Sequence, residues 1–184
     1  MGQIASRGQI RMAFIRWALV MVPLLLLLGI ASGILSGSGY ANRWFAALDK
    51  PAEMPPGWAF AATWTILYVL MGLALALILG ARGARQRRIA IGLFVVQFVM
   101  NLAWSPLFFV AHQVDTALIL LALLFVVAAL TTWRFARIRP IAGLLLLPYL
   151  FWLVFAGYLN YEIARLNPGA GTLAPAGAST QISV

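Results

Sequence analysis

The side chains best able to bind a ligand by hydrogen bonding and stacking lie inside long apolar stretches. They are aromatic residues and amides at helical spacing. Gln97, Asn101 and Trp104 are separated by four and three residues, so they share one face of a helix. An amide in hydrocarbon is costly without a partner, so Asn101 must face another helix, water or a ligand. Two interpretations stay open, an interhelical hydrogen bond and a ligand contact. Pro106 removes a backbone hydrogen bond and frees a carbonyl of the preceding turn.

Two further apolar stretches repeat this combination. Trp64 and Tyr68 are four residues apart, and the neighbouring Thr65 adds a hydroxyl. Three helices that each offer an aromatic ring and a hydrogen-bonding group favour an apolar ligand pocket with a few orienting polar groups. Core packing remains the simpler explanation for any one of them alone. The last stretch mixes aromatic, small and amide residues on one stripe: Tyr149, Trp152, Ala156 and Asn160.

Conventional catalytic and metal-binding groups are scarce. The chain has no cysteine, which excludes a disulfide framework and a thiolate nucleophile. The four acids, Asp49, Glu53, Asp115 and Glu162, lie in connections or at the end of a stretch, which argues against a proton pump. With His112 as the one histidine, neither a multi-ligand metal site nor a Ser-His-Asp arrangement is supported, although His112 stays open as a single axial ligand to haem iron. The sequence therefore assigns no catalytic residue and no metal.

The elements that must position these side chains are membrane helices. Of the 184 residues, 64% are hydrophobic and only 9% charged, against roughly 25% charged in soluble domains. At about 20 residues per span, the length leaves no room for a soluble domain. The sequence predicts an all-α membrane protein, a bundle of five transmembrane helices. The expected spans cover about residues 17–37, 58–79, 89–110, 116–135 and 140–161.

The chain divides into three parts. Residues 1–16 form a basic lead, residues 17–166 the membrane domain, and residues 167–184 a tail rich in Pro, Gly, Ala and Ser that is expected to be disordered. The first apolar stretch could instead be a cleaved signal peptide, because arginines precede it. It is longer than a typical signal core and lacks a clear A-x-A site, so we expect it to be retained.

The net charge of +9 comes from arginines beside the spans, where they set topology and meet anionic lipid headgroups. No basic face exists apart from a membrane segment, which argues against nucleic acid as a partner. The positive-inside rule predicts a cytoplasmic amino terminus in a multi-pass protein of the inner, or cell, membrane. The predicted inner side carries Arg7, Arg11, Arg16, Arg82, Arg85, Arg87, Arg88, Arg134, Arg137 and Arg139.

The connection over residues 38–57 is the one long loop. Pro51, Pro55 and Pro56 restrict its backbone, so it is either a stiff lid on a cavity, the start of the next helix, or both. Glycines and tryptophans elsewhere have simpler roles. Gly29, Gly33 and Gly37 predict a dimer face or an internal helix contact, and Trp17, Trp58 and Trp133 predict interfacial anchors.

Four segments carry a family resemblance: "WFAALDKP" from Trp44, "PPGWAFAATWTILY" from Pro55, "NLAWSPLFF" from Asn101 and "PYLFWLVFAGYLN" from Pro148. Over about residues 44–167 the chain resembles the tryptophan-rich sensory protein and translocator protein family, also called the peripheral benzodiazepine receptor family. The resemblance implies a five-helix membrane fold that is often dimeric. It also implies a cavity open toward the first long connection, which binds porphyrins such as protoporphyrin IX and haem, and in some members sterols or drug-like molecules.

The resemblance also implies roles for particular positions. Leu159, Tyr161 and Arg165 fit a sterol-contact pattern that is weak on its own. One departure is Glu53, which stands where the family commonly has an aromatic residue; we expect it to weaken stacking from the loop and to repel porphyrin propionates. The cavity residues implied by motif position are Trp44, Trp58, Trp64, Asn101, Trp104, Trp152 and Ala156.

The function expected is that of a membrane receptor or sensor that binds tetrapyrroles and affects their traffic, metabolism or stress regulation. Expected partners are a porphyrin or another flat amphipathic molecule, a lipid or sterol, and a second copy of the chain, with no obligatory cofactor. Two alternatives are a transporter of such molecules and an enzyme that degrades porphyrin in light. The sequence shows neither inverted repeats nor a conventional catalytic group, so both rank below the receptor.

Overall fold

The computed structural model describes residues 7–172 and is all-α over that range. Five long helices each have the length and apolar composition to cross a membrane, which confirms the predicted fold class. A short helix and a 3₁₀ turn complete the described chain. The elements are α1 (Arg7–Leu35), α2 (Arg43–Ala47), α3 (Gly57–Gly80), α4 (Arg87–Phe109), α5 (Val114–Ile138), α6 (Pro140–Leu166) and η1 (Ala170–Thr172).

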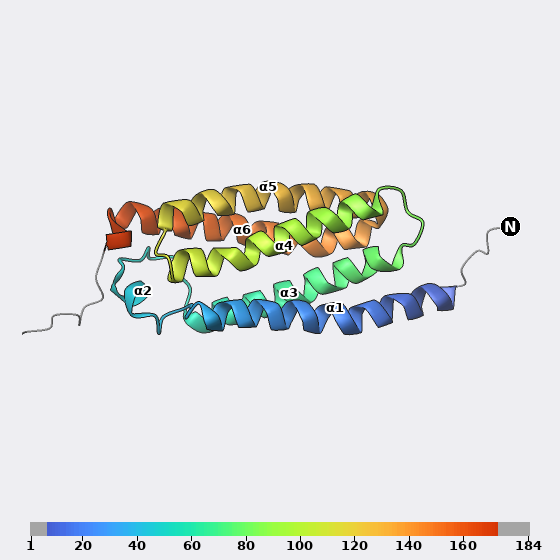
Figure 1. The fold of residues 1–184 in the computed structure, drawn as a ribbon, viewed down its shortest axis with the longest axis horizontal. Helices are drawn as coiled ribbons and strands as arrows, with labels where there is room; N and C mark the ends of the chain where they lie inside the picture. The colour runs from blue at the N-terminus through green and yellow to red at the C-terminus, as the bar shows by residue number, and fades with distance from the viewer. Residues whose placement is uncertain (1–6, 173–184) are drawn as a thin grey trace, which may run out of the picture.

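The long helices lie side by side in one elongated bundle (Figure 1). The strongest pairings are α1 with α3, α5 with α6, and α4 with α5, and α3 also packs on α6. One end of the bundle holds α2, η1 and the loop between α4 and α5. The other end holds the start of α1, the loop between α3 and α4, and the turn between α5 and α6. We call these the loop end and the arginine end.

Two features of the helices differ most from the sequence prediction. Helix α1 begins at Arg7, not near Trp17, because nothing between these residues breaks a helix even though several are polar. Helix α2 was not predicted, since five residues are too few for a periodic signal. Its start is defined by Asn42, whose side-chain oxygen accepts a hydrogen bond from the Phe45 amide at 3.0 Å.

The predicted disordered tail begins too early. Asn167 donates to the backbone carbonyls of Asp49 and Ile163 at 2.9 and 2.8 Å, and η1 follows it. Asn167 is 8% exposed, so these bonds are shielded and hold residues 167–172 against the loop. The rest of the predicted tail, residues 173–184, and residues 1–6 of the basic lead lie outside the described residues.

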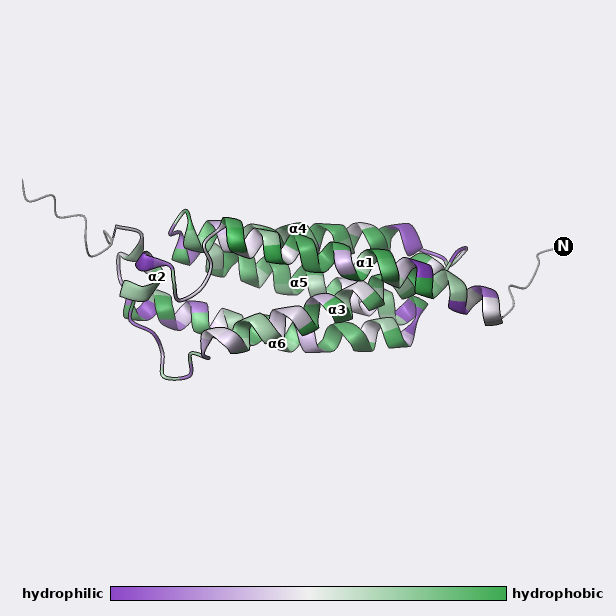
Figure 2. Ribbon diagram, turned by 90° about the horizontal axis from the view of Figure 1, so that it is seen from below, coloured by the Kyte–Doolittle hydropathy of each residue, from purple (hydrophilic) through white to green (hydrophobic). Residues whose placement is uncertain are grey.

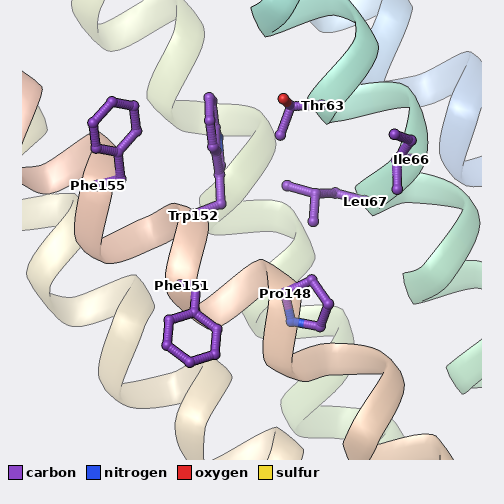
Figure 3. Close-up of a pocket in the computed structure, with 7 residues that line it drawn as sticks. All are labelled: Thr63, Ile66, Leu67, Pro148, Phe151, Trp152 and Phe155. Atoms are coloured by element: carbon purple, nitrogen blue, oxygen red, sulfur yellow. The ribbon is translucent and has the colours of Figure 1, made fainter. Parts of the chain in front are cut away.

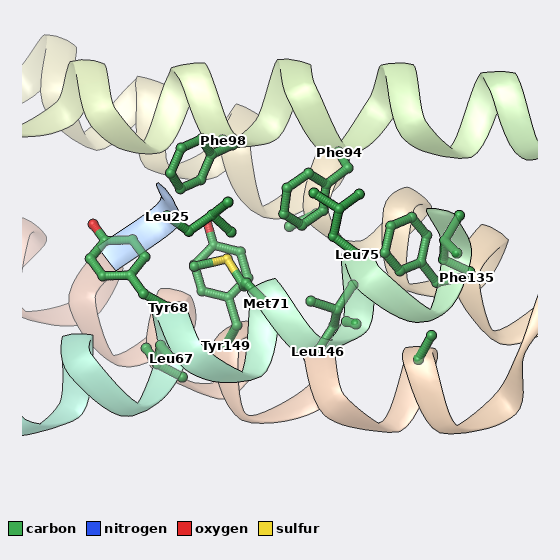
Figure 4. Packing of buried hydrophobic residues seen from close by; sticks show 14 of the residues in the cluster. Leu25, Leu67, Tyr68, Met71, Leu75, Phe94, Phe98, Phe135, Leu146 and Tyr149 are labelled. Carbon is green, nitrogen blue, oxygen red and sulfur yellow. The ribbon is translucent and has the colours of Figure 1, made fainter. Parts of the chain in front are cut away.

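Small residues set the close approach of neighbouring helices. A Cβ on Gly72 of α3 would lie 2.8 Å from the Cα of Val22 of α1, and one on Gly143 of α6 would lie 2.9 Å from the Cα of Ala136 of α5. Backbones can approach this closely only where a side chain is missing. The interior beside these contacts is filled by a cluster that includes Met71, Leu146 and several phenylalanines (Figure 4).

Hydropathy varies along the bundle as a membrane requires. The middle of each long helix is apolar, and hydrophilic residues gather at the two ends (Figure 2). Large apolar side chains are also exposed on the outer faces, for example Leu27, Val99 and Phe151 at 66, 58 and 75%. Such an outer surface suits contact with lipid acyl chains. Acyl chains offer no hydrogen-bond partners, so the side chains that face them are apolar.

Candidate functional site

A cavity of about 970 Å³ opens within the loop end of the bundle. Its walls come from α1, α3, α4 and α6, with a small part from α5, and residues of the α1–α3 loop line it as well. Its volume lies at the upper end of the range for small-molecule sites, about 300–1,000 Å³. The cavity is therefore large enough for a ligand with several fused or linked rings.

Aromatic side chains from two helices form one wall. Trp64 stacks on Tyr68 with ring centroids 5.3 Å apart, and Trp152 of α6 meets Trp64 edge-to-face at 6.3 Å. Phe60 contacts Trp152 at 5.6 Å, also edge-to-face. Fixed rings in these orientations present broad apolar faces at a low cost in side-chain freedom. This wall can stack a flat conjugated ligand.

A buried hydrogen-bond chain lies at the inner limit of the cavity. The Tyr68 hydroxyl donates to Asn101 Oδ1 at 3.2 Å, and Asn101 Nδ2 donates to the Tyr149 hydroxyl at 3.3 Å. Asn101 also lines the cavity, whereas Tyr149, 1% exposed, lies behind it. The interhelical interpretation of Asn101 is therefore confirmed, because it joins three helices, whereas its contact with a ligand stays a prediction.

A second amide fixes the opposite wall. Trp104 donates from its indole Nε1 to Asn160 Oδ1 at 3.3 Å, and Asn160 Nδ2 donates to the Val114 carbonyl at 2.9 Å. Phe108 stacks on Trp104 with centroids 4.9 Å apart. These contacts connect α4, α5 and α6, so the Trp104 ring is held in place before any ligand binds.

Trp152 has an unused donor. Its indole nitrogen is buried and has no hydrogen-bond partner in the described chain. A buried N–H without an acceptor is costly, and because this nitrogen has almost no exposed surface, a ligand in the cavity reaches it only if the Trp152 ring moves. Trp152 also lines a shallower groove of about 520 Å³ on the outer face between α3 and α6. Figure 3 shows Leu67 of α3 pointing toward the α6 side chains of this groove. Because Trp152 lines both the groove and the cavity, it lies between them.

The carbonyl freed by Pro106 has found a partner. Proline at 106 cannot donate to Leu102, and Ser32 of α1 donates its hydroxyl to the Leu102 carbonyl at 2.9 Å instead. This bond supports the sequence expectation that the proline leaves an acceptor open. It also attaches α1 to α4 beside the cavity, where few other contacts join them.

The loop between α1 and α3 covers the mouth of the cavity. Trp44 donates from its indole nitrogen to the Ala170 carbonyl at 2.8 Å and stacks on His112 with centroids 4.2 Å apart. Tyr40 donates its hydroxyl to the Pro55 carbonyl at 2.7 Å, and burial raises the pKa of Tyr40 from its ordinary value. The loop is thus held by hydrogen bonds at both sides of α2. The interpretation of the prolines as a helix start is confirmed, because Pro56 is the N-cap residue of α3, whereas a lid function of the loop stays a prediction.

Charge is sparse around the cavity. Arg43, which is exposed at the mouth, is the one charged side chain among the residues that line it. Glu53 does not line the cavity; it is exposed and interacts with the Tyr158 hydroxyl on α6. Glu53 therefore makes no direct contact with the cavity, and its expected effect on stacking and on porphyrin propionates stays a prediction. The mouth carries positive charge.

The structure brings most of the sequence-predicted site residues together. Trp58 is 75% exposed and does not line the cavity, and Tyr149 lies behind the lining. Of the sterol-contact pattern, Leu159 faces the cavity, whereas Tyr161 and Arg165 are exposed outside it and Arg165 pairs with Glu162 at 2.7 Å. The predicted residues that line the cavity are Trp44, Trp64, Tyr68, Asn101, Trp104, Trp152, Ala156 and Asn160.

Sequence reasoning considered His112 only as a haem ligand and did not place it in the cavity, and it left the roles of three glycines open. His112 lines the cavity, and its positive φ of 54° shows that the short loop after α4 turns it there. Gly29 packs internally, since a Cβ on it would lie 2.1 Å from the Tyr68 ring, and Gly37, at φ 57°, ends α1. Gly33 has no atom within 4 Å of a Cβ and faces the cavity. The homodimer stays a prediction.

These features define an integral, multi-pass membrane protein with an aromatic cavity beneath a loop. The model of the TspO/MBR family matches residues 19–166, so the chain belongs to this family. It is 42% identical to tryptophan-rich protein TspO of Chlorobaculum tepidum over 70% of this chain and 82% of that protein. It is 41% identical to the translocator protein of Sus scrofa over 71% and 79% of the two chains. The tryptophan-rich sensory protein of Cereibacter sphaeroides is 36% identical over 68% and 78%.

Proposed function

We propose that this protein is a membrane receptor or sensor that binds a porphyrin, such as protoporphyrin IX or haem, in the cavity at the loop end. Membership of the TspO/MBR family, with relatives named as sensory and translocator proteins, supports a receptor or sensor role. The observation that carries the ligand class is the cavity of about 970 Å³ with Trp64, Trp104 and Trp152 in its lining. Flat conjugated rings stack well on such walls.

The lining of the cavity suits both parts of a porphyrin, its flat ring and its carboxylates. The Trp152 ring offers an apolar face, and Arg43 offers an exposed cation. The macrocycle would lie inside the cavity with its two propionates at the mouth, where Arg43 can pair with them. No aspartate or glutamate lines the cavity, so no protein carboxylate repels the propionates there. His112 lines the cavity and is the side chain that would hold the iron of a metallated ring.

Quenching of tryptophan fluorescence by protoporphyrin IX in detergent tests the proposal. The wild type should show saturable quenching, and Trp104→Ala/Trp152→Ala should lose it. Trp17→Ala/Trp133→Ala is the matched control, because it also removes two indoles but leaves the cavity intact. If protoporphyrin IX quenches the fluorescence of both double variants equally, the cavity is not the binding site.

The uncharged dimethyl ester of protoporphyrin IX distinguishes ring stacking from the charge interaction. Arg43→Gln should lower the affinity for protoporphyrin IX by roughly tenfold, or about 1.4 kcal/mol, within the range for a hydrogen bond to a charged group. The same variant should leave the affinity for the dimethyl ester unchanged. Equal losses for the acid and the ester would place the propionates away from Arg43.

The two alternative functions are separated by direct measurements. Loss of the bound porphyrin's absorbance in light, abolished by Trp→Phe changes in the cavity, would indicate the degrading enzyme. Counterflow of porphyrin in proteoliposomes would indicate a transporter. A receptor shows saturable binding and neither of these activities.

We also propose that the amino terminus lies inside the cell, because the arginine end carries most of the exposed cations of the described chain. The chain lacks cysteine, so single cysteines can be introduced without a background. Gly83→Cys should resist a membrane-impermeant maleimide in intact cells, and Ala52→Cys should react with it. The opposite labelling pattern would invert the orientation.

A further inference from the structure

The arginine end of the bundle holds a concentration of positive charge that the cavity does not use. Two segments far apart in the sequence meet there, the α3–α4 loop and the turn between α5 and α6 (Figure 1). All four acids of the chain belong to the loop end, in the α1–α3 loop, the first turn of α5 and the last turns of α6. Within residues 7–172, no carboxylate therefore neutralises the arginine end.

Some of these arginines have structural roles. Arg87 donates to the carbonyls of Ile78 and Leu79, both at 2.9 Å, and so caps the last turn of α3. Arg134 donates to the side-chain oxygen of Gln86 and lies 4.6 Å from the Trp133 ring centre. The bond between Arg134 and Gln86 joins the two segments, so their remaining cations are held near one another.

Apart from Arg87 and Arg134, the arginines of these two segments are exposed and have no hydrogen-bond or ion-pair partner in the described chain. The α3–α4 loop and the start of α4 contribute one cluster, and the end of α5 contributes the other. Both clusters lie where long apolar helices begin or end, which is the depth of the lipid headgroups. Trp133, half exposed on the same end, is the residue type that marks this depth. The clusters are Arg82, Arg85 and Arg88, and Arg137 and Arg139.

We propose that these two clusters bind the headgroup of an anionic phospholipid, with the acyl chains lying along the outer faces of the bundle. Arginine presents a fork of N–H donors that matches phosphate oxygens, and free arginines without carboxylate neighbours keep those donors available. The partner is a lipid and not a soluble anion, because the clusters stand directly above exposed apolar surface such as Ile89 and Ile141, at 53 and 63%. The positive-inside rule needs the charges only on one side of the membrane; it does not need the two segments to be joined.

The test measures lipid binding to the full chain in detergent by native mass spectrometry, with phosphatidylglycerol and phosphatidylcholine as probes. Phosphatidylglycerol should bind more tightly, and its affinity should fall roughly fivefold for each arginine removed, as expected for basic residues at an anionic surface. The variants are Arg82→Gln/Arg85→Gln/Arg88→Gln and Arg137→Gln/Arg139→Gln. The matched control, Lys50→Gln/Arg165→Gln, removes two cations from the loop end and should change the affinity less than twofold.

Equal binding of the two lipids, or equal losses in the arginine-end and control variants, would overturn the proposal. Full displacement of the lipid by an excess of inorganic phosphate would overturn it as well, since the site would then bind soluble anions. Circular dichroism of each variant checks that its helices are intact, which is expected because the substituted side chains are exposed. The result does not depend on porphyrin binding, so it stands or falls separately from the proposed function.

Discussion

The two halves of the bundle interior contain similar residue types and use them differently. Toward the arginine end, Phe94 stacks on both Phe98 and Phe135, with ring centroids 6.1 and 5.7 Å apart, and the three rings fill the space (Figure 4). Toward the loop end, Trp64 and Trp152 surround a cavity. The lesson is that aromatic content does not distinguish a core from a ligand site. The position of the small residues and of the amides does.

Small residues illustrate the difference. In the packed half, Gly72 and Gly143 face a neighbouring helix backbone, so the missing side chain is replaced by protein. In the hollow half, Gly33 and Ala156 face the cavity, and a Cβ added to Gly33 would meet nothing within 4 Å. Amides follow the same division, since Asn101 and Asn160 line the cavity but Gln97 is 1% exposed inside the packed half.

The largest expected effect comes from a matched pair of phenylalanines. Phe135→Ala removes a ring that is fully buried in the packed half and should lower the free energy of unfolding by about 3 kcal/mol, the low end for this change. Phe60→Ala removes a ring that lines the cavity and should cost less than half as much. Unfolding of both variants in detergent, followed by circular dichroism, measures the difference. Equal losses would mean that the cavity wall is packed as tightly as the core.

Glycines sharpen the same comparison. Gly72→Ala forces a methyl group to within 2.8 Å of the α1 backbone and should destabilise the protein by about 2 kcal/mol. Gly33→Ala has open space and should change the stability by less than about 0.5 kcal/mol. Melting temperatures of the two variants test this, and a destabilised Gly33→Ala would show that α1 packs more closely at the cavity than the structure indicates.

The boundary between the halves depends on Asn101. Asn101→Leu leaves the Tyr68 and Tyr149 hydroxyls without their partner and should cost about 1–2 kcal/mol. Adding Tyr149→Phe to this variant should recover part of the loss, because a buried unpaired hydroxyl is removed. The same Tyr149→Phe change in the wild-type protein should instead be destabilising. Chemical unfolding of the four proteins supplies the cycle, and additive losses would exclude the hydrogen-bond chain.

The smallest effect concerns the bond between Ser32 and the carbonyl that Pro106 frees. Ser32→Ala should cost about 0.6–1 kcal/mol, the usual size of a hydrogen bond between membrane helices. In a Pro106→Ala background the Leu102 carbonyl regains a backbone donor, so the same change should cost less. Thermal unfolding of the two pairs measures the coupling. A Ser32→Ala cost that is unaffected by residue 106 would contradict this account.

The fold class could be predicted from composition alone, because apolar stretches of this length have only one stable form in a bilayer. The helical faces of Asn101 with Trp104, and of Trp152 with Ala156 and Asn160, followed from periodicity. Periodicity within one helix could not show which neighbour each face meets. It placed Tyr149 on the site stripe, although the structure buries it one layer behind Asn101. The interfacial interpretation of Trp58 agrees with its 75% exposure, whereas its cavity role followed from the resemblance alone.

Loop residues were the least predictable. Arg43, His112 and Glu53 lie in connections, where no period relates a residue to a direction. Their orientation depends on contacts between distant segments, such as the bond from Trp44 to Ala170 and the stacking of Trp44 on His112. The turn that directs Glu53 away from the cavity depends on the same contacts.

The sequence by itself determined that this protein has five membrane helices, a one-sided distribution of arginine and an inventory of tryptophans and amides inside the spans. These properties follow from hydropathy, charge and helical period, which act locally along the chain. Only the tertiary structure decided which aromatic residues pack and which surround a cavity. The reason is that a cavity is a property of how several helices meet: the absence of atoms beside Gly33 and the missing partner of the Trp152 indole cannot be encoded in any one of them.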